Sequence, residues 1–103
     1  MTEHADTARA LAALGHEARL HIFRFLVRAG RDGATVGQIG AHLDLPASTL
    51  AHHLRSLVGA GLLTQTRQGR EVVTRVDFAR MTGVIEFLSS ECCTGITARR
   101  DVA

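Results

Sequence analysis

The stretch LPASTLAHHLRSLVGAGLLTQTRQGREVVTR, residues 45–75, decides the fold, because a strongly patterned helix in it is followed by two strand-like segments. The apolar side chains of its first half recur at the spacing of one helical face and predict a buried stripe: Leu50, Leu54, Leu57 and Val58. Proline is tolerated in the first turn of a helix, and glycine commonly ends one. We therefore expect a helix from about Pro46 to about Val58.

A β-hairpin is expected directly after this helix. The sequence Gly59-Ala60-Gly61 ends the helical pattern, and the segments Leu62–Arg67 and Arg70–Val76 are rich in threonine and valine. These residue types favour strands, and a two-residue loop that contains glycine, here Gln68-Gly69, suits a tight hairpin.

The side of the predicted helix that faces away from the apolar stripe carries small or hydrogen-bonding residues and no acidic one: Ser48, Thr49, His52, Arg55 and Ser56. A helix that enters the major groove of DNA needs such groups to read base edges. Ordinary solvent-exposed helices also have a polar face, but they usually carry Glu and Lys, and this face has neither. The pattern favours DNA recognition. His53 lies near the edge of the apolar stripe, and we interpret it as a half-buried packing residue without a role in pH sensing.

The tip of the predicted hairpin is basic and polar, because Arg67, Gln68 and Arg70 surround its loop. Such a tip can lie along the phosphate backbone or in the minor groove. A merely soluble loop is the competing interpretation. The position directly after a DNA-reading helix favours the first one.

Three helices are expected before the deciding stretch and one after it: Ala5–Leu14, Glu17–Ala29, Val36–Leu43, and Phe78 to about Ser90. The third begins with a capping box, Thr35-x-x-Gln38, and Asp77 can cap the last. Apolar spacing predicts one inward side on the second helix and one on the last: Leu20, Phe23, Leu26 and Val27, then Met81, Val84, Ile85 and Leu88.

The predicted fold is a mainly α winged helix-turn-helix of order α-α-α-α-β-β-α, in which the corner Asp44–Pro46 joins the two central helices. The 103 residues fit a single domain over residues 1–103, with a flexible tail from about residue 95. A net charge of +2 and a pI near 9.0 permit nucleic-acid binding without demanding it. No apolar run reaches the roughly 20 residues of a membrane span. With no secretory signal at the start, a cytoplasmic protein is expected.

Four stretches of the chain resemble the ArsR/SmtB family of metal-responsive winged-helix repressors: Ala13-Leu14-Gly15-His16 leading to Arg19-Leu20, Ser48–Leu54, Leu57–Leu63 and Arg67-Gln68-Gly69-Arg70. The resemblance covers about Ala8–Cys93. It implies a homodimer in which the first and last helices pair. It also implies a palindromic operator in double-stranded DNA, released when an effector binds elsewhere. The family often has serine at the positions of Pro46 and Ala51.

The only two cysteines, Cys92 and Cys93, are adjacent and follow the last predicted helix. The resemblance implies a choice among sensor sites. One places a cysteine cluster in the third helix, and another places Asp and His ligands for zinc along the last helix. This chain has no cysteine in the third helix and no histidine in the last, so both sites are absent. A third resembles this chain, with vicinal cysteines after the last helix as in some arsenite repressors. Those repressors usually add a third cysteine a few residues on, where this chain has Ala98, Arg99 and Arg100.

Soft thiolates favour thiophilic centres, so Cys92 and Cys93 are candidate ligands for a trivalent arsenical, either arsenite or methylarsenite, or for antimonite. No cofactor is expected to be obligatory. Zinc, which wants four ligands, ranks lower. If Arg99 and Arg100 raise the thiolate content, the rival effector is an oxidant or persulfide. A winged-helix module for protein contacts, without an effector, is a further alternative. No general base accompanies the cysteines, so an enzyme is not expected.

Overall fold

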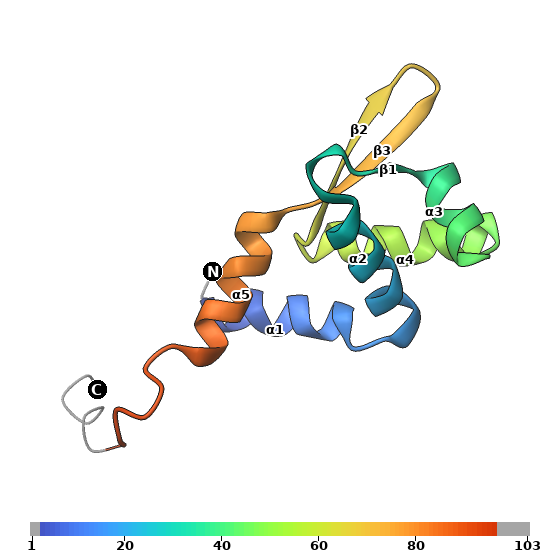
Figure 1. Ribbon diagram of the computed structural model, residues 1–103. Helices are drawn as coiled ribbons and strands as arrows, with labels where there is room; N and C mark the ends of the chain where they lie inside the picture. The colour runs from blue at the N-terminus through green and yellow to red at the C-terminus, as the bar shows by residue number, and fades with distance from the viewer. Residues whose placement is uncertain (1–2, 97–103) are drawn as a thin grey trace.

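The computed structural model describes residues 3–96 and contains five α-helices and three strands within that range (Figure 1). The elements follow one another in this order: α1 (Glu3–Leu14), α2 (Glu17–Ala29), a short 3-10 turn (Gly30–Asp32), β1 (Ala34–Thr35), α3 (Val36–Leu43), α4 (Ala47–Gly59), β2 (Leu63–Gln68), β3 (Glu71–Val76) and α5 (Phe78–Ser89). The winged helix-turn-helix prediction is confirmed. One element was missed, the two-residue strand β1.

The three strands form an antiparallel sheet in the order β1-β3-β2. In β1, Ala34 pairs with Thr74 and Thr35 pairs with Val73. A strand of two residues shows no alternation of apolar and polar side chains, so sequence periodicity cannot detect it.

The loop between β2 and β3 lies one residue later in the sequence than predicted, which shifts the pairing between the two strands by two residues. Gln68 pairs with Glu71, so the loop consists of Gly69 and Arg70 instead of Gln68 and Gly69. Gly69 has a φ of 66°, and a positive φ at the first loop position is the pattern of a type II′ turn, which prefers glycine there. The shift places Arg67 opposite Val72, whereas the predicted register places it opposite Arg70.

Helices α3 and α4 meet at a tight corner. The capping box that starts α3 is present, since the Thr35 hydroxyl accepts a hydrogen bond from the Gln38 amide at 3.1 Å and the Gln38 side chain accepts one from the Thr35 amide at 2.8 Å. Asp44 ends α3 in the left-handed conformation, with a φ of 55°. Pro46 is the N-cap residue of α4, so α4 begins one residue later than predicted and has no side-chain cap.

The core lies where α1, α2, α3 and α4 meet the sheet, and its largest fully buried side chains are Ile22, Leu26, Ile39, Leu50, Leu57, Leu62, Leu63 and Thr74. The predicted inward sides are only partly correct. Leu20 on α2 is exposed, as are Ile85 and Leu88 on α5, whereas Val84 is buried. Val58 is 36% exposed, because it lies about 70° around the helix from the centre of the three buried leucines Leu50, Leu54 and Leu57.

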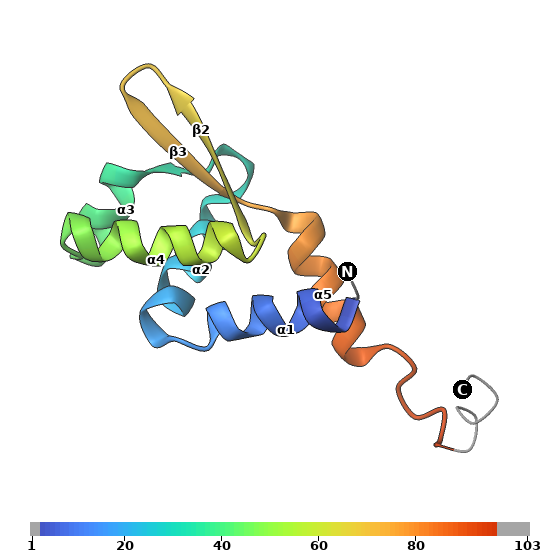
Figure 2. The same ribbon diagram turned by 180° about the vertical axis from the view of Figure 1, so that it is seen from behind.

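Helix α5 lies beside α1, away from the wing, as both views show (Figures 1 and 2). The Asp77 side chain caps α5 by accepting a hydrogen bond from the Arg80 amide at 3.0 Å, as predicted. The Arg80 side chain in turn donates to the Asp6 carbonyl of α1 at 3.2 Å. Of the predicted flexible tail, residues 97–103 lie outside the described residues, and that prediction stays untested. Among residues 3–96, no helix combines the length and apolar character needed to cross a membrane.

Candidate DNA-binding surface and thiol pair

The predicted DNA-reading residues share one side of α4, here called the outer face: Ser48, Thr49, His52, Arg55 and Ser56. Four of them are exposed. Ser56 is half-buried, and its hydroxyl donates to the His52 carbonyl at 3.3 Å, so its hydrogen-bonding capacity is partly used within the helix. The outer face therefore offers two hydroxyl groups, an imidazole and a guanidinium to a partner.

His53 is more deeply buried than predicted, with 6% of its surface exposed, and its Nδ1 atom is buried without a hydrogen-bond partner. Burial lowers the pKa of His53 below its ordinary value of 6.5, and the charges of His16, Arg19 and His52 lower it further. The neutral ring suits this position. His53 thus belongs to the packing of α4 and not to its outer face.

His16 has a structural role that the sequence did not reveal. Its Nδ1 atom accepts a hydrogen bond from the Ala18 amide at 3.2 Å, which makes His16 the N-cap residue of α2. Its ring lies 4.8 Å from the ring of His53, measured between centroids. Histidine is not among the preferred N-cap residues, so no sequence signal marks it.

The hairpin formed by β2, β3 and their loop is called the wing from here on, and its tip carries the other predicted DNA contacts, Arg67, Gln68 and Arg70. All three are exposed. The wing projects from the body of the protein, and β2 begins directly after α4 and its short turn (Figures 1 and 2). The chain therefore carries its two predicted DNA-binding segments in direct succession.

Cys92 and Cys93, here called the thiol pair, lie in a turn just after the end of α5. The Cys92 amide donates to the Ser89 carbonyl at 3.2 Å, and the backbone at Cys93 is left-handed with a φ of 68°. Both side chains are exposed, and the two Sγ atoms are 2.8 Å apart. The pair can therefore present two sulfur atoms to one ligand.

Within the thiol pair, Cys92 has a perturbed pKa. A hydrogen bond with Cys93 raises the pKa of the Cys92 thiol above its ordinary range. Arg99 and Arg100, expected to act in the opposite direction, lie outside the described residues. Within residues 3–96, no group of three His, Cys, Asp or Glu side chains is arranged to hold a metal ion. A four-coordinate zinc site does not fit the residues described here.

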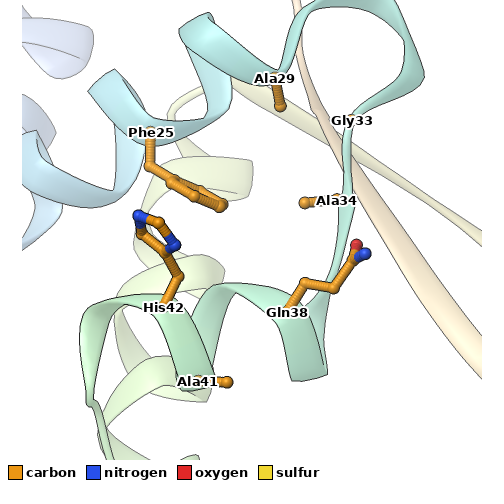
Figure 3. Close-up of a pocket in the computed structure, with 7 residues that line it drawn as sticks. All are labelled: Phe25, Ala29, Gly33, Ala34, Gln38, Ala41 and His42. Carbon is orange, nitrogen blue, oxygen red and sulfur yellow. The ribbon is translucent and has the colours of Figure 1, made fainter.

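A pocket of about 530 Å³ lies between α2 and α3 (Figure 3). The rings of Phe25 and His42 face each other across one end of it, with centroids 4.6 Å apart. At the other end, the Gln38 side chain is committed to the capping box of α3. The remaining wall consists of the small residues Ala29, Gly33, Ala34 and Ala41. Neither the outer face nor the thiol pair lines this pocket.

A second, apolar groove of about 400 Å³ lies among α1, α2 and α5. Its lining includes Leu11, Leu20, Ile85 and Leu88, all of them large and exposed. Ile85 is 58% and Leu88 is 61% exposed. Contiguous exposed apolar surface of this kind is typical of a protein–protein interface.

A short helix joined through a tight corner to a helix with a polar, non-acidic outer face, followed by a projecting hairpin, defines a winged helix-turn-helix protein. A family model described as a helix-turn-helix domain matches residues 14–66, just over half of the chain. The chain belongs to this family and, within it, to the winged helix-turn-helix transcriptional regulators of the ArsR type. It is a DNA-binding regulator and not an enzyme.

Solved structures support this assignment over most of the chain. An ArsR-like transcriptional regulator from Rhodococcus sp. RHA1 is 26% identical, with a TM-score of 0.76, and the match covers 97% of this chain and 94% of that one. The transcriptional repressor PagR of Bacillus anthracis is 32% identical, with a TM-score of 0.68, over 82% of this chain and 93% of that one. A possible transcriptional regulator for arsenical resistance is 27% identical, with a TM-score of 0.68, over 79% and 81% of the two chains. No curated protein matches the sequence.

Proposed function

We propose that the protein is a homodimeric repressor that releases its operator when a trivalent arsenical binds Cys92 and Cys93. Each subunit reads one half of a palindromic site with the outer face of α4, and the wing tip contacts the DNA backbone. The observation that carries the proposal is the 2.8 Å separation of two exposed sulfur atoms at the end of α5.

The arrangement of side chains supports the DNA contacts. His52 and Arg55 stand exposed on the same side of α4, and Arg67 and Arg70 are exposed at the wing tip. Arginine can bind guanine or phosphate through two parallel hydrogen bonds. A dimer doubles this set of contacts and fits the two-fold symmetry of a palindromic site.

The apolar groove among α1, α2 and α5 supports the dimer. Ile85 and Leu88 on α5 are exposed in its lining, so a second copy related by a two-fold axis can bury the same residues on both sides. A chain of this size buries only about 60–65% of its surface on folding, so burial against a second copy adds needed stability.

The chemistry of the thiol pair supports the arsenical. Each exchange of an As–OH group with a thiol forms one As–S bond and releases one water molecule, so a thiol that retains its proton at neutral pH is a competent reactant. Methylarsenite has two such hydroxyl groups, and two thiols replace both of them. Arsenite keeps its third hydroxyl. The match of two thiols to two hydroxyls favours methylarsenite. A similar solved structure is described as a possible transcriptional regulator for arsenical resistance, which agrees with an arsenical as the effector.

The position of the thiol pair supports coupling to DNA. Cys92 follows α5, whose exposed apolar residues form the proposed dimer contact, so a ligand that reshapes this turn alters how two subunits meet. The arsenical must bind the DNA-free form more tightly than the DNA-bound form. Coupling between two such sites is typically about 1–3 kcal/mol, a change of about 5- to 150-fold in DNA affinity.

The test is a titration of methylarsenite or arsenite into the protein bound to a fluorescent duplex, selected from a random library by the wild-type chain. Wild-type protein is expected to release the duplex, whereas the double variant Cys92→Ser, Cys93→Ser binds DNA equally well and retains it. The single variants Cys92→Ser and Cys93→Ser are the matched controls, because each leaves one sulfur and is expected to respond only weakly. Arsenical-induced release from the double variant would show that the site is elsewhere.

Thiol oxidation is the second candidate, and the same short Sγ–Sγ distance favours it. A disulfide between adjacent residues strains its small ring, so reversible closure requires the turn after α5 to change shape. Peroxide treatment of the DNA complex separates the two functions. Release by peroxide, reversed by dithiothreitol, with no response to arsenicals, identifies the oxidation sensor.

A further inference from the structure

Arg75 on β3 connects three separate segments of the chain. Its Nε atom donates to the Arg31 carbonyl at 3.0 Å, in the 3-10 turn that follows α2. Its Nη1 atom donates to the Thr66 hydroxyl on β2 at 2.8 Å. One side chain thereby ties both strands of the wing to the turn that ends α2.

The absence of a side chain at Gly33 leaves room for the aliphatic part of the Arg75 side chain. Gly33, just after that turn, has a φ of 68°, and a Cβ atom placed there would lie 2.6 Å from Cγ of Arg75. The same atom would lie 2.4 Å from the Thr74 carbonyl oxygen. Only a glycine at this position allows β3 and the Arg75 side chain to approach so closely.

Leu63, Thr74 and Val76 at the base of the wing are buried in the core, whereas the part of the wing beyond Val73 is largely exposed. Strand β1 pairs only with Val73 and Thr74, so the residues beyond Val73 toward the tip pair only with the opposite strand of the hairpin. On the other face, the Gln65 side chain donates to the Thr74 hydroxyl at 3.1 Å, but this bond joins the two strands to each other. The four residue steps from Arg75 to Glu71 span about 13 Å at the usual strand rise, so a small rotation at the base moves the tip substantially.

We propose that Arg75 is a positioning residue that sets the direction of the wing and thereby allows Arg67 and Arg70 to reach the DNA backbone. This inference rests on the proposed function, because it assumes that the wing tip contacts DNA. The planar guanidinium supplies both hydrogen bonds at once in a fixed geometry. A lysine ammonium retains the positive charge, but as a compact, flexibly held group it does not reproduce that geometry.

The test uses four variants. Two change Arg75 alone, Arg75→Met and Arg75→Lys. The third, the wing-tip variant, combines Arg67→Gln and Arg70→Gln, and the fourth adds Arg75→Met to the wing-tip variant. Affinity for the selected duplex is measured over a range of salt concentrations. Removal of one interaction with a phosphate lowers the slope of log affinity against log salt by about 0.9. Arg75→Met and Arg75→Lys are each expected to lower the salt slope and the DNA affinity as much as the wing-tip variant does. The combined variant is expected to lower neither of them further.

Two results would overturn the inference. If Arg75→Lys retains the wild-type slope while Arg75→Met does not, Arg75 contacts phosphate itself. If Arg75→Met weakens binding equally with and without the wing-tip arginines, Arg75 does not act through them. Wild-type protein without any salt-dependent affinity for duplex DNA contradicts the proposed function instead, so the two failures are distinguishable.

Thr66→Val serves as the second variant in case Arg75→Met does not fold. It removes one of the two hydrogen bonds from an exposed position and leaves the charge of Arg75 unchanged. It is expected to lower the salt slope by less than Arg75→Met does, and to leave the midpoint of thermal unfolding unchanged. A wild-type slope in a Thr66→Val protein that folds normally contradicts the role given to this hydrogen bond.

Discussion

His53 shows how burial and neighbouring charges determine the protonation state of a histidine in the folded protein. Its ring lies among positively charged or titratable neighbours, His16, Arg19 and His52, and its Nδ1 atom has no partner. The folded state therefore favours the neutral ring, whereas the unfolded chain protonates near the ordinary pKa of 6.5.

The sign of the pH dependence follows from this lowered pKa. As the pH falls below about 6.5, His53 becomes protonated in the unfolded state but stays neutral in the folded state, so the free energy of unfolding decreases. The decrease levels off below the folded pKa. Urea unfolding between pH 7 and pH 5 is expected to show a larger decrease for the wild type than for His53→Leu. An identical decrease in both proteins contradicts the role of His53.

The outer face of α4 was predictable residue by residue because helical periodicity separates it from the buried leucines. The errors fall where periodicity is weakest. Val58 lies at the edge of the stripe, and the hydroxyl of Ser56 bonds to its own helix. His16 was not identified as an N-cap, and nothing in the sequence marks Arg75 as a link between distant segments, because its partner Arg31 is 44 positions away.

The turn between α2 and β1 shows which structural information is absent from local sequence patterns. Helices α3 and α5 were predictable from their caps, and the hairpin from its threonine, valine and glycine residues. Strand β1 and the hairpin register depend on pairing with β3, which local propensity does not encode. The close approach of Gly33 to Thr74 is equally non-local.

Two glycines in this turn provide a matched comparison. Gly30 and Gly33 have φ values of 72° and 68°, but a Cβ atom at Gly30 meets nothing within 4 Å, whereas one at Gly33 meets the Thr74 carbonyl at 2.4 Å. Gly30→Ala is expected to cost about 1–3 kcal/mol, because the Gly30 backbone, with a φ of 72° and a ψ of −151°, lies in a region that is essentially restricted to glycine. Gly33→Ala is expected to cost about 1–3 kcal/mol more for the steric overlap. Equal free energies of unfolding for the two variants, measured in urea, contradict the predicted overlap.

At the scale of the whole molecule, the exposed apolar residues of α5 are the main discrepancy from the sequence analysis. The spacing of Ile85 and Leu88 predicted an inward side, and the resemblance implied pairing of the first and last helices. In the isolated chain these side chains are exposed. A monomer sequence pattern does not distinguish burial in the core from burial against a second copy.

Leu88→Glu tests the proposed dimer. A carboxylate in an apolar interface loses its hydration without gaining a partner, so the variant is expected to sediment as a monomer and to bind the palindromic duplex at least about tenfold more weakly. Thr82→Glu is the matched control, since Thr82 is exposed on the same helix and does not line the groove. The account is wrong if both variants remain dimeric, or if the wild-type protein is itself a monomer.

The central claim is that the outer face of α4 binds DNA. Its most direct test is to titrate the selected fluorescent duplex with the double variant His52→Ala, Arg55→Ala and to measure the DNA affinity by fluorescence anisotropy. The control, His21→Ala with Arg28→Ala, removes the same residue types from exposed positions on α2. Removing a side chain that binds a base or a phosphate typically costs about 1–3 kcal/mol, so the α4 variant is expected to bind at least about tenfold more weakly than wild type, while the α2 variant binds normally. Equal affinity of the α4 variant and the wild-type protein would contradict the claim.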